Sequence, residues 1–184
     1  MTKKIKKKLP ANKKLPDNVI PLPRREAMEG TMAGIFGRGK GRAVDKAQEI
    51  MYDAWDAPTS ARAIAQARKA LDVSADCADA YVLLAQETAR TLDEEIDLYK
   101  KGVEAGERAL GKAAFKQNAG HFWGILETRP YMRARAGLAE CLWESRRLEE
   151  AVEHYQDMLR LNPNDNQGLR YILMTHLIEL GFDE

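Results

Sequence analysis

The sequence has few of the residues that carry covalent or metal chemistry. Only 2 cysteines and 3 histidines occur among 184 residues. Cys77 and Cys141 do not form a CxxC pair, and no HExxH motif is present, so the common zinc and thiol-redox signatures are missing. Neither cysteine lies in a recognisable nucleophile context, and no GxSxG elbow occurs. We therefore expect no enzyme activity, no metal and no cofactor, and reduced thiols, although the sequence alone leaves a disulfide open.

Long apolar runs are also missing. No stretch approaches the roughly 18–20 apolar residues that a membrane-spanning helix needs. The lysines at the N-terminus are not followed by the apolar region of a secretory signal. These two absences predict a cytoplasmic protein without a membrane span.

Charge is unevenly distributed along the chain. Residues 1–42 contain 12 Lys or Arg and 3 Asp or Glu, whereas residues 43–184 contain 17 and 25. Residues 1–25 are rich in proline and lysine, and residues 30–41 carry five glycines. Such composition cannot bury enough apolar surface to offset the entropy of ordering. We expect residues 1–42 to form a disordered basic arm and linker.

Two features of this arm could bind phosphates. Residues 34–40 match GxxxxGK, but Gly41 stands where a phosphate loop has Ser or Thr, so this segment is interpreted as linker. The lysines within residues 3–14 could contact nucleic acid or another anionic surface without sequence specificity. Alternatively, they could form only a solubilising arm.

Beyond the arm, apolar residues recur at spacings of three and four, which predicts amphipathic helices and no strands. We expect an all-α domain over residues 43–184. The expected helices are at residues 43–56, 59–72, 76–91, 93–117, 130–146, 148–160 and 165–180.

Residues 132–165 have the pattern of a repeated helical hairpin. They read MRARAGLAECLWESRRLEEAVEHYQDMLRLNPND. Ala139 and Ala151 are small enough for two antiparallel helices to approach closely, and Pro163 ends the second helix. This 34-residue segment resembles a tetratricopeptide repeat (TPR). The resemblance implies a TPR-like helical-hairpin solenoid.

The same frame divides the domain into four units. They cover about residues 44–77, 78–131, 132–165 and, in part, 166–184. The second unit is longer than a repeat, which indicates an insertion before residue 131. The last unit lacks its second helix, so either the chain is part of a longer protein or something packs on this end. Residues 120–143 also resemble segments of longer, uncharacterised bacterial TPR proteins.

The resemblance implies that particular first-helix positions face a concave groove. These are Tyr52, Trp55, Gln86, Arg90, Arg133, Glu140, Trp143 and Arg170. Arginine matches carboxylates, and aromatic side chains supply contact area. The alternative is that the two tryptophans pack at repeat junctions. We expect a scaffold or adaptor that binds a protein or peptide; the alternative is a nucleic-acid-associated adaptor that uses the lysine-rich arm.

The insertion holds the densest group of distinctive side chains. The candidates are His121, Trp123, Glu127, Arg129 and Tyr131. In one interpretation the aromatic residues, with Phe122, fill a gap beside a long helix, and Glu127 pairs with Arg129 or Arg133. In the other, the insertion is a protruding recognition element.

Overall fold

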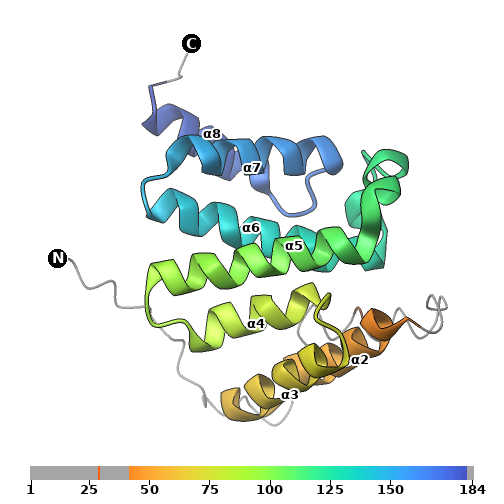
Figure 1. Cartoon of the computed structure of the whole chain (residues 1–184). Helices are drawn as coiled ribbons and strands as arrows, with labels where there is room; N and C mark the ends of the chain where they lie inside the picture. The colour runs from red at the N-terminus through yellow and green to blue at the C-terminus, as the bar shows by residue number, and fades with distance from the viewer. Residues whose placement is uncertain (1–28, 30–41, 182–184) are drawn as a thin grey trace, which may run out of the picture.

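The computed structural model describes residue 29 and residues 42–181, and this part of the chain is helical without strands (Figure 1). The all-α class expected from the periodicity is confirmed. The expected disordered arm, residues 1–28 and 30–41, lies outside the described residues. The helices are α2 (Ala43–Trp55), α3 (Ser60–Val73), α4 (Ala78–Thr88), α5 (Leu92–Gln117), α6 (Arg129–Glu144), α7 (Leu148–Leu161) and α8 (Leu169–Glu179), with 3-10 helices η1 (Phe122–Gly124) and η2 (Leu126–Thr128).

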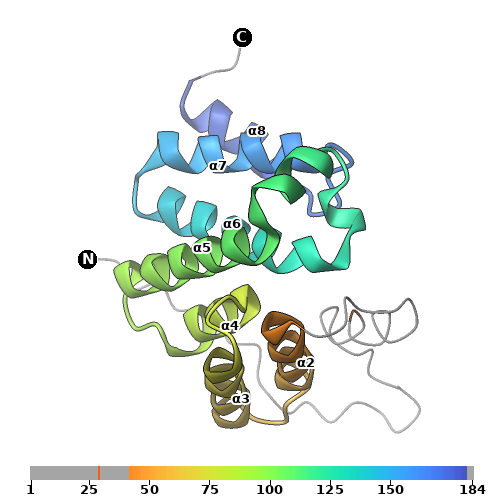
Figure 2. The same cartoon turned by 45° about the vertical axis from the view of Figure 1, so that its right-hand side comes forward.

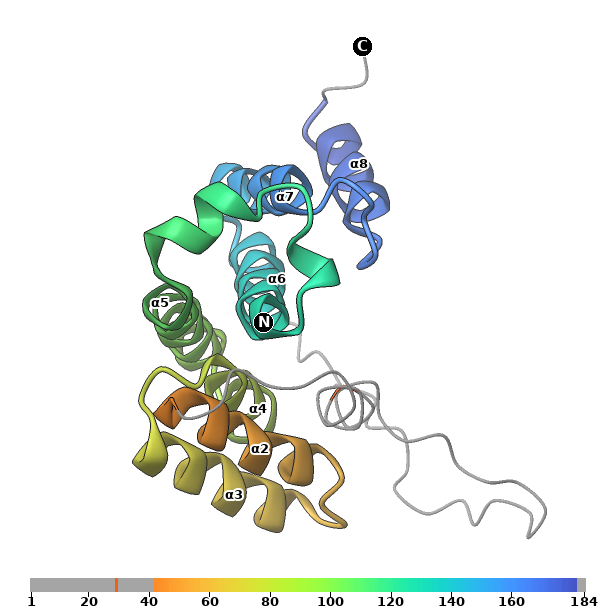
Figure 3. The ribbon, with the colours of Figure 1, turned by 90° about the vertical axis from the view of Figure 1, so that its right-hand side faces the viewer.

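Consecutive helices pack against each other as a stack of hairpins. In Figure 1, α4, α5, α6 and α7 lie one above another, with α2 and α3 below them and α8 at the other end. Figure 3, which looks along several of these helices, shows α5 to one side of α4 and α6. One continuous core of buried alanine, leucine and aromatic side chains runs through the stack.

Local signals in the sequence set the ends of several helices. Thr59 caps α3 by accepting a hydrogen bond from the backbone N–H of Arg62, and Thr91 caps α5 in the same way. Pro163 follows the end of α7 at Leu161, since proline cannot continue a helix. These signals explain why the observed bounds lie close to the predicted ones.

Small residues bring α5 and α6 close together. A Cβ atom on Gly106 of α5 would lie 2.8 Å from the Cβ of Tyr131 and 3.1 Å from its Cα. One turn earlier, a Cβ on Gly102 would lie 3.1 Å from the Cβ of Ala134. The two backbones therefore approach more closely than larger residues would allow.

The insertion begins where α5 breaks. The helix expected over residues 93–117 is present, but Gly111 has φ 70° and ψ 160°, a conformation that favours glycine, and it interrupts the helix. Beyond it, Phe115 packs 5.1 Å from Phe122 and 5.0 Å from Tyr131, measured between ring centroids. Gly120 donates its N–H to the carbonyl of Leu161 at the end of α7. The insertion thus folds back on the stack (Figure 2).

The last helix, α8, has apolar side chains on both sides. Leu169 and Leu173 are buried, whereas Tyr171 and Ile178 are 75% and 56% exposed. None of the helices within residues 42–181 is both long and apolar enough to cross a membrane.

A polar contact joins α6 to α7. Arg135 donates from Nε to Nδ1 of His154 at 3.0 Å, and it forms an ion pair with Asp157. Nδ1 of His154 must be unprotonated to accept this bond. Burial, and then the charge of Arg135, lower the pKa of His154 to about 4.

We expect Gly106→Ala to lower the free energy of unfolding by up to about 2 kcal/mol. The added methyl group meets the backbone of Tyr131, at a cost of about 1–3 kcal/mol, which exceeds the gain of about 1 kcal/mol in helix propensity. Urea denaturation followed by circular dichroism measures this change. Gly124→Ala is the control, since nothing lies within 4 Å of a Cβ there. Equal stability of the two variants would contradict the close approach.

We expect stability to fall between about pH 6.5 and pH 4 because of His154. The folded protein holds this histidine neutral down to a pKa of about 4, whereas the unfolded chain takes up the proton near its ordinary pKa of 6.5. The unfolded state therefore binds more protons in this pH range, and the free energy of unfolding decreases as pH falls. Burial also lowers the pKa of His176, which adds to the same trend.

Melting temperatures at pH 7 and pH 4.5 test this prediction. His154→Gln should lose less stability over this interval than the wild-type chain, because the glutamine does not titrate. An identical loss in both proteins would show that His154 is not responsible. Asp157 is not the cause, since its pKa is lowered from an ordinary value already below this interval.

Candidate functional site

A cavity of about 360 Å³ opens on the face formed by the first helix of each hairpin, and we call it the first-helix cavity. Its walls come from α2, α4, α5, α6 and the turn before α8. The lining residues are Trp55, Val82, Gln86, Tyr99, Arg133, Ala136, Gly137, Glu140 and Gln167. Trp55, Gln86, Arg133 and Glu140 were predicted from sequence to face a groove, and the structure brings these four together.

The other four predicted groove residues do not line this cavity. Tyr52 lines a separate, smaller pocket. Arg90 is exposed just after α4, and exposed Arg170 on α8 bonds to the carbonyl of Pro163. Trp143 stacks on His176 of α8, with ring centroids 3.5 Å apart. The packing alternative for the tryptophans therefore describes Trp143.

Two polar atoms at the first-helix cavity lack partners. Trp55 is 6% exposed, and its Nε1 has no hydrogen-bond partner in the part of the chain that the structure describes. The same holds for Oε1 of Gln167. Both atoms have almost no solvent-accessible surface, so a group entering the cavity would pair with them only after the side chains around them shift.

A buried ion pair underlies the cavity. Arg133 of α6 donates from Nε to Oδ1 of Asp79 at 2.8 Å and from Nη2 to Oδ2 at 2.6 Å. Asp79 on α4 is fully buried and also accepts from Nε2 of Gln48 on α2 at 2.7 Å. Burial alone would lower the pKa of Arg133, but the charges and hydrogen bonds of its carboxylate partners raise it above the ordinary value. Arg133 therefore stays charged, and through Asp79 and Gln48 the network joins α6, α4 and α2.

A second carboxylate completes this network. Glu29 is 2% exposed and accepts from Nη1 of Arg133 at 2.8 Å and from Nη1 of Arg129 at 3.0 Å. Arg129 also donates from Nε to the carbonyl of Trp123, and its guanidinium lies 5.3 Å from the centre of the Trp123 ring. Two arginines one helical turn apart thus hold one glutamate.

The pairing predicted for Glu127 is wrong. Arg129 and Arg133 pair with Glu29 and Asp79, and Glu127 is exposed. Of the other insertion candidates, Trp123 and Tyr131 are buried and His121 is exposed. The aromatic residues fill the space beside α5 and α6, as the first interpretation of the insertion proposed.

Neither carboxylate of the network was predicted from the sequence. Asp79 offered one signal, since it is the single charge in the otherwise apolar start of α4. Glu29 offered none, because it lies 100 and 104 residues from its partners. No local pattern relates residues so far apart.

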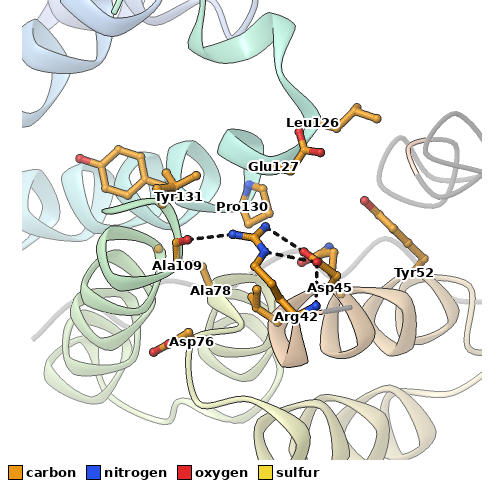
Figure 4. Close-up of a pocket in the computed structure, with 14 residues that line it drawn as sticks. Arg42, Asp45, Tyr52, Asp76, Ala78, Ala109, Leu126, Glu127, Pro130 and Tyr131 are labelled. Atoms are coloured by element: carbon orange, nitrogen blue, oxygen red, sulfur yellow. Dashed lines mark hydrogen bonds and ion pairs between the residues drawn. The ribbon is translucent and has the colours of Figure 1, made fainter. Parts of the chain in front are cut away.

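The smaller pocket, of about 70 Å³, lies between α2, α5 and the start of α6 (Figure 4). Arg42 crosses it, pairing with Asp45 and donating to the carbonyl of Ala109. Leu126, Pro130 and Tyr131 contribute to its walls. Its size leaves room for little more than a few methyl groups, so we place the candidate site at the first-helix cavity.

We expect Asp79→Ala to lower the free energy of unfolding by about 3–5 kcal/mol, since it removes the bidentate partner of a buried arginine. Chemical denaturation measures this loss. Arg108→Ala is the control because it breaks the exposed pair with Asp76 and should cost no more than about 1 kcal/mol. Similar losses in both variants would show that the buried ion pair contributes no more to stability than the exposed one.

Comparison with known proteins assigns the family. The family model described as "ST7 protein" matches residues 38–177. The chain is 30% identical over 130 residues to "Protein ST7 homolog" of Drosophila melanogaster, covering 68% of this chain and 24% of that protein. It is 31% identical over 135 residues to "Suppressor of tumorigenicity 7 protein-like" of Homo sapiens, covering 71% and 24%. No solved structure matches.

These findings correct the resemblance inferred from residues 132–165. The matching family model is that of the ST7 protein and not of the tetratricopeptide repeat, and the relatives cited are animal and not bacterial proteins. The chain spans about a quarter of the length of these relatives. Their printed names describe no enzyme reaction. Because this family model matches most of the chain, the chain belongs to the ST7 protein family.

Proposed function

We propose that this chain is a protein–protein interaction scaffold, a helical-hairpin solenoid whose first-helix cavity receives an extended segment of a partner polypeptide. The observation that supports this most directly is the unpaired Nε1 of Trp55 beside the cavity. With a small shift of the side chains around these atoms, a polypeptide backbone would supply a carbonyl for this donor and an N–H for the unpaired Oε1 of Gln167. The partner would thereby satisfy two polar atoms that the described chain leaves unpaired.

The chemistry of the walls also favours a polypeptide ligand. Trp55, Val82 and Tyr99 provide buried apolar and aromatic surface, whereas Gln86 and Glu140 are exposed and polar. An aromatic centre with a polar rim is typical of the small region that contributes most of the binding energy in a protein interface.

The proposal includes no enzyme activity. The relatives' names describe no reaction, and no group of His, Cys, Asp or Glu in the described residues has the arrangement of a metal site. Cys77 is an unsuitable nucleophile because burial raises the pKa of its thiol to about 12. The cytoplasmic location stays a prediction. The nucleic-acid role of residues 3–14 also stays a prediction, since those residues lie outside the described part.

Peptide selection tests the proposed site. Peptides are selected from a phage-displayed library on the wild-type chain, and their affinities are measured by fluorescence anisotropy. We expect Trp55→Phe, which keeps an aromatic ring but removes the N–H, to weaken binding about two- to tenfold, the equivalent of one hydrogen bond. Trp143→Phe is the matched control, since Trp143 does not line the cavity. Selected peptides that bind all three proteins equally would place the binding surface elsewhere.

A further inference from the structure

Glu29 occupies a position that a partner could also occupy. Its carboxylate contacts Arg133, which lines the first-helix cavity, and Arg129, which lies one turn earlier on the same helix. The three side chains are nearly buried, with 2% of Glu29, 14% of Arg129 and 11% of Arg133 exposed. Glu29 is therefore held as a bound ligand would be, by two arginines at the edge of the cavity.

The charges show that this site requires a carboxylate from outside the helical stack. Arg133 and Asp79 form an ion pair and neutralise each other. Both residues belong to helices of the stack. Arg129 has no carboxylate partner among the described residues other than Glu29. Without Glu29, the site would retain two arginines and one aspartate, a net charge of +1 at the edge of the cavity. An uncompensated positive charge held between packed helices favours binding of an anion.

We propose that Arg129 and Arg133 form a carboxylate-binding subsite of the first-helix cavity, and that Glu29 occupies it as an internal ligand which competes with an acidic residue of the partner polypeptide. This inference rests on the proposed function, because it names the chemistry of the same partner. Arginine suits the role, since its planar, forked donors match a carboxylate.

Glu29 is the exchangeable member of the network and Asp79 is the fixed one. Asp79 lies within α4, is fully buried and accepts three hydrogen bonds, two from Arg133 and one from Gln48. Glu29 accepts one bond from each arginine. Its departure would leave the bidentate pair between α4 and α6 intact. A partner carboxylate can therefore replace Glu29 without breaking the stack.

A peptide of the chain's own sequence tests the exchange. A fluorescein-labelled peptide of residues 24–34 is titrated with the full chain, as wild type and as Glu29→Ala. We expect the variant to bind the peptide at least about tenfold more tightly, because in the wild type the tethered Glu29 competes at a high effective concentration. The same peptide with Gln in place of Glu29 should bind neither protein.

Matched variants assign the binding to the arginine pair. In the Glu29→Ala background, Arg129→Gln should abolish peptide binding. Arg90→Gln removes the same charge from an exposed predicted groove residue that Glu29 does not contact, and it should leave binding unchanged. Glu29→Gln is titrated in parallel and replaces Glu29→Ala if melting curves show that the latter is unfolded.

Two results would overturn the proposal. The first is failure of the peptide to bind a folded Glu29→Ala or Glu29→Gln chain, which would make Glu29 a permanent structural tie. The second is equal binding of the Glu and Gln peptides, which would remove the carboxylate from recognition. Neither result depends on the Trp55→Phe experiment, so failure of this subsite is distinguishable from failure of the proposed polypeptide-binding cavity.

Discussion

The buried pair between Arg133 and Asp79 is the interaction on which the arrangement of the first helices depends. Asp79 is fully buried and Arg133 is 11% exposed, so packing that keeps these two charges within the stack also keeps them together. A buried pair adds little net stability compared with apolar residues of the same size, but it disfavours every arrangement that separates the two groups. Because Gln48 also bonds to Asp79, the network favours the observed placement of α2, α4 and α6. That placement creates the cavity beside Arg133.

Close packing on the other side of the stack supports the same geometry. Gly102 and Gly106 let α5 approach the backbone of α6, and this contact fixes the start of α6, where Arg129 and Tyr131 lie. The aromatic residues of the insertion then pack around Tyr131. The insertion therefore supports the base of the site, and its most conspicuous residues act mainly by packing.

The proposed roles follow from a difference between groups that pair or pack within the helical stack and groups that do not. The ion pair, the glycines and the insertion hold the helices in place. Trp55 and Gln167 at the cavity retain unpaired polar atoms, and the Arg129–Arg133 pair takes its second carboxylate from outside the helical stack. Polar groups that lack a partner within the helical stack give an interface its specificity, because only a ligand with matching groups satisfies them. In the ST7 family, where the relatives cited are about four times longer than the matched region, such a scaffold would form one part of a larger protein.

The sequence by itself determined the positions of the helices along the chain. Apolar residues at spacings of three and four, threonine caps and Pro163 are local signals, and local signals set where a helix begins and ends. Trp55, Gln86, Arg133 and Glu140 were placed on one face by the resemblance to a tetratricopeptide repeat, and not by a local signal. Only the tertiary structure decided which partners the arginines take. Glu127 lies close to Arg129 in sequence, yet the arginine binds Glu29 from 100 residues away, because burial selects the carboxylate that packing brings within reach of both arginines. The ion pair with Asp79 and the unpaired Nε1 of Trp55 were likewise invisible in sequence, since both depend on how separate helices meet.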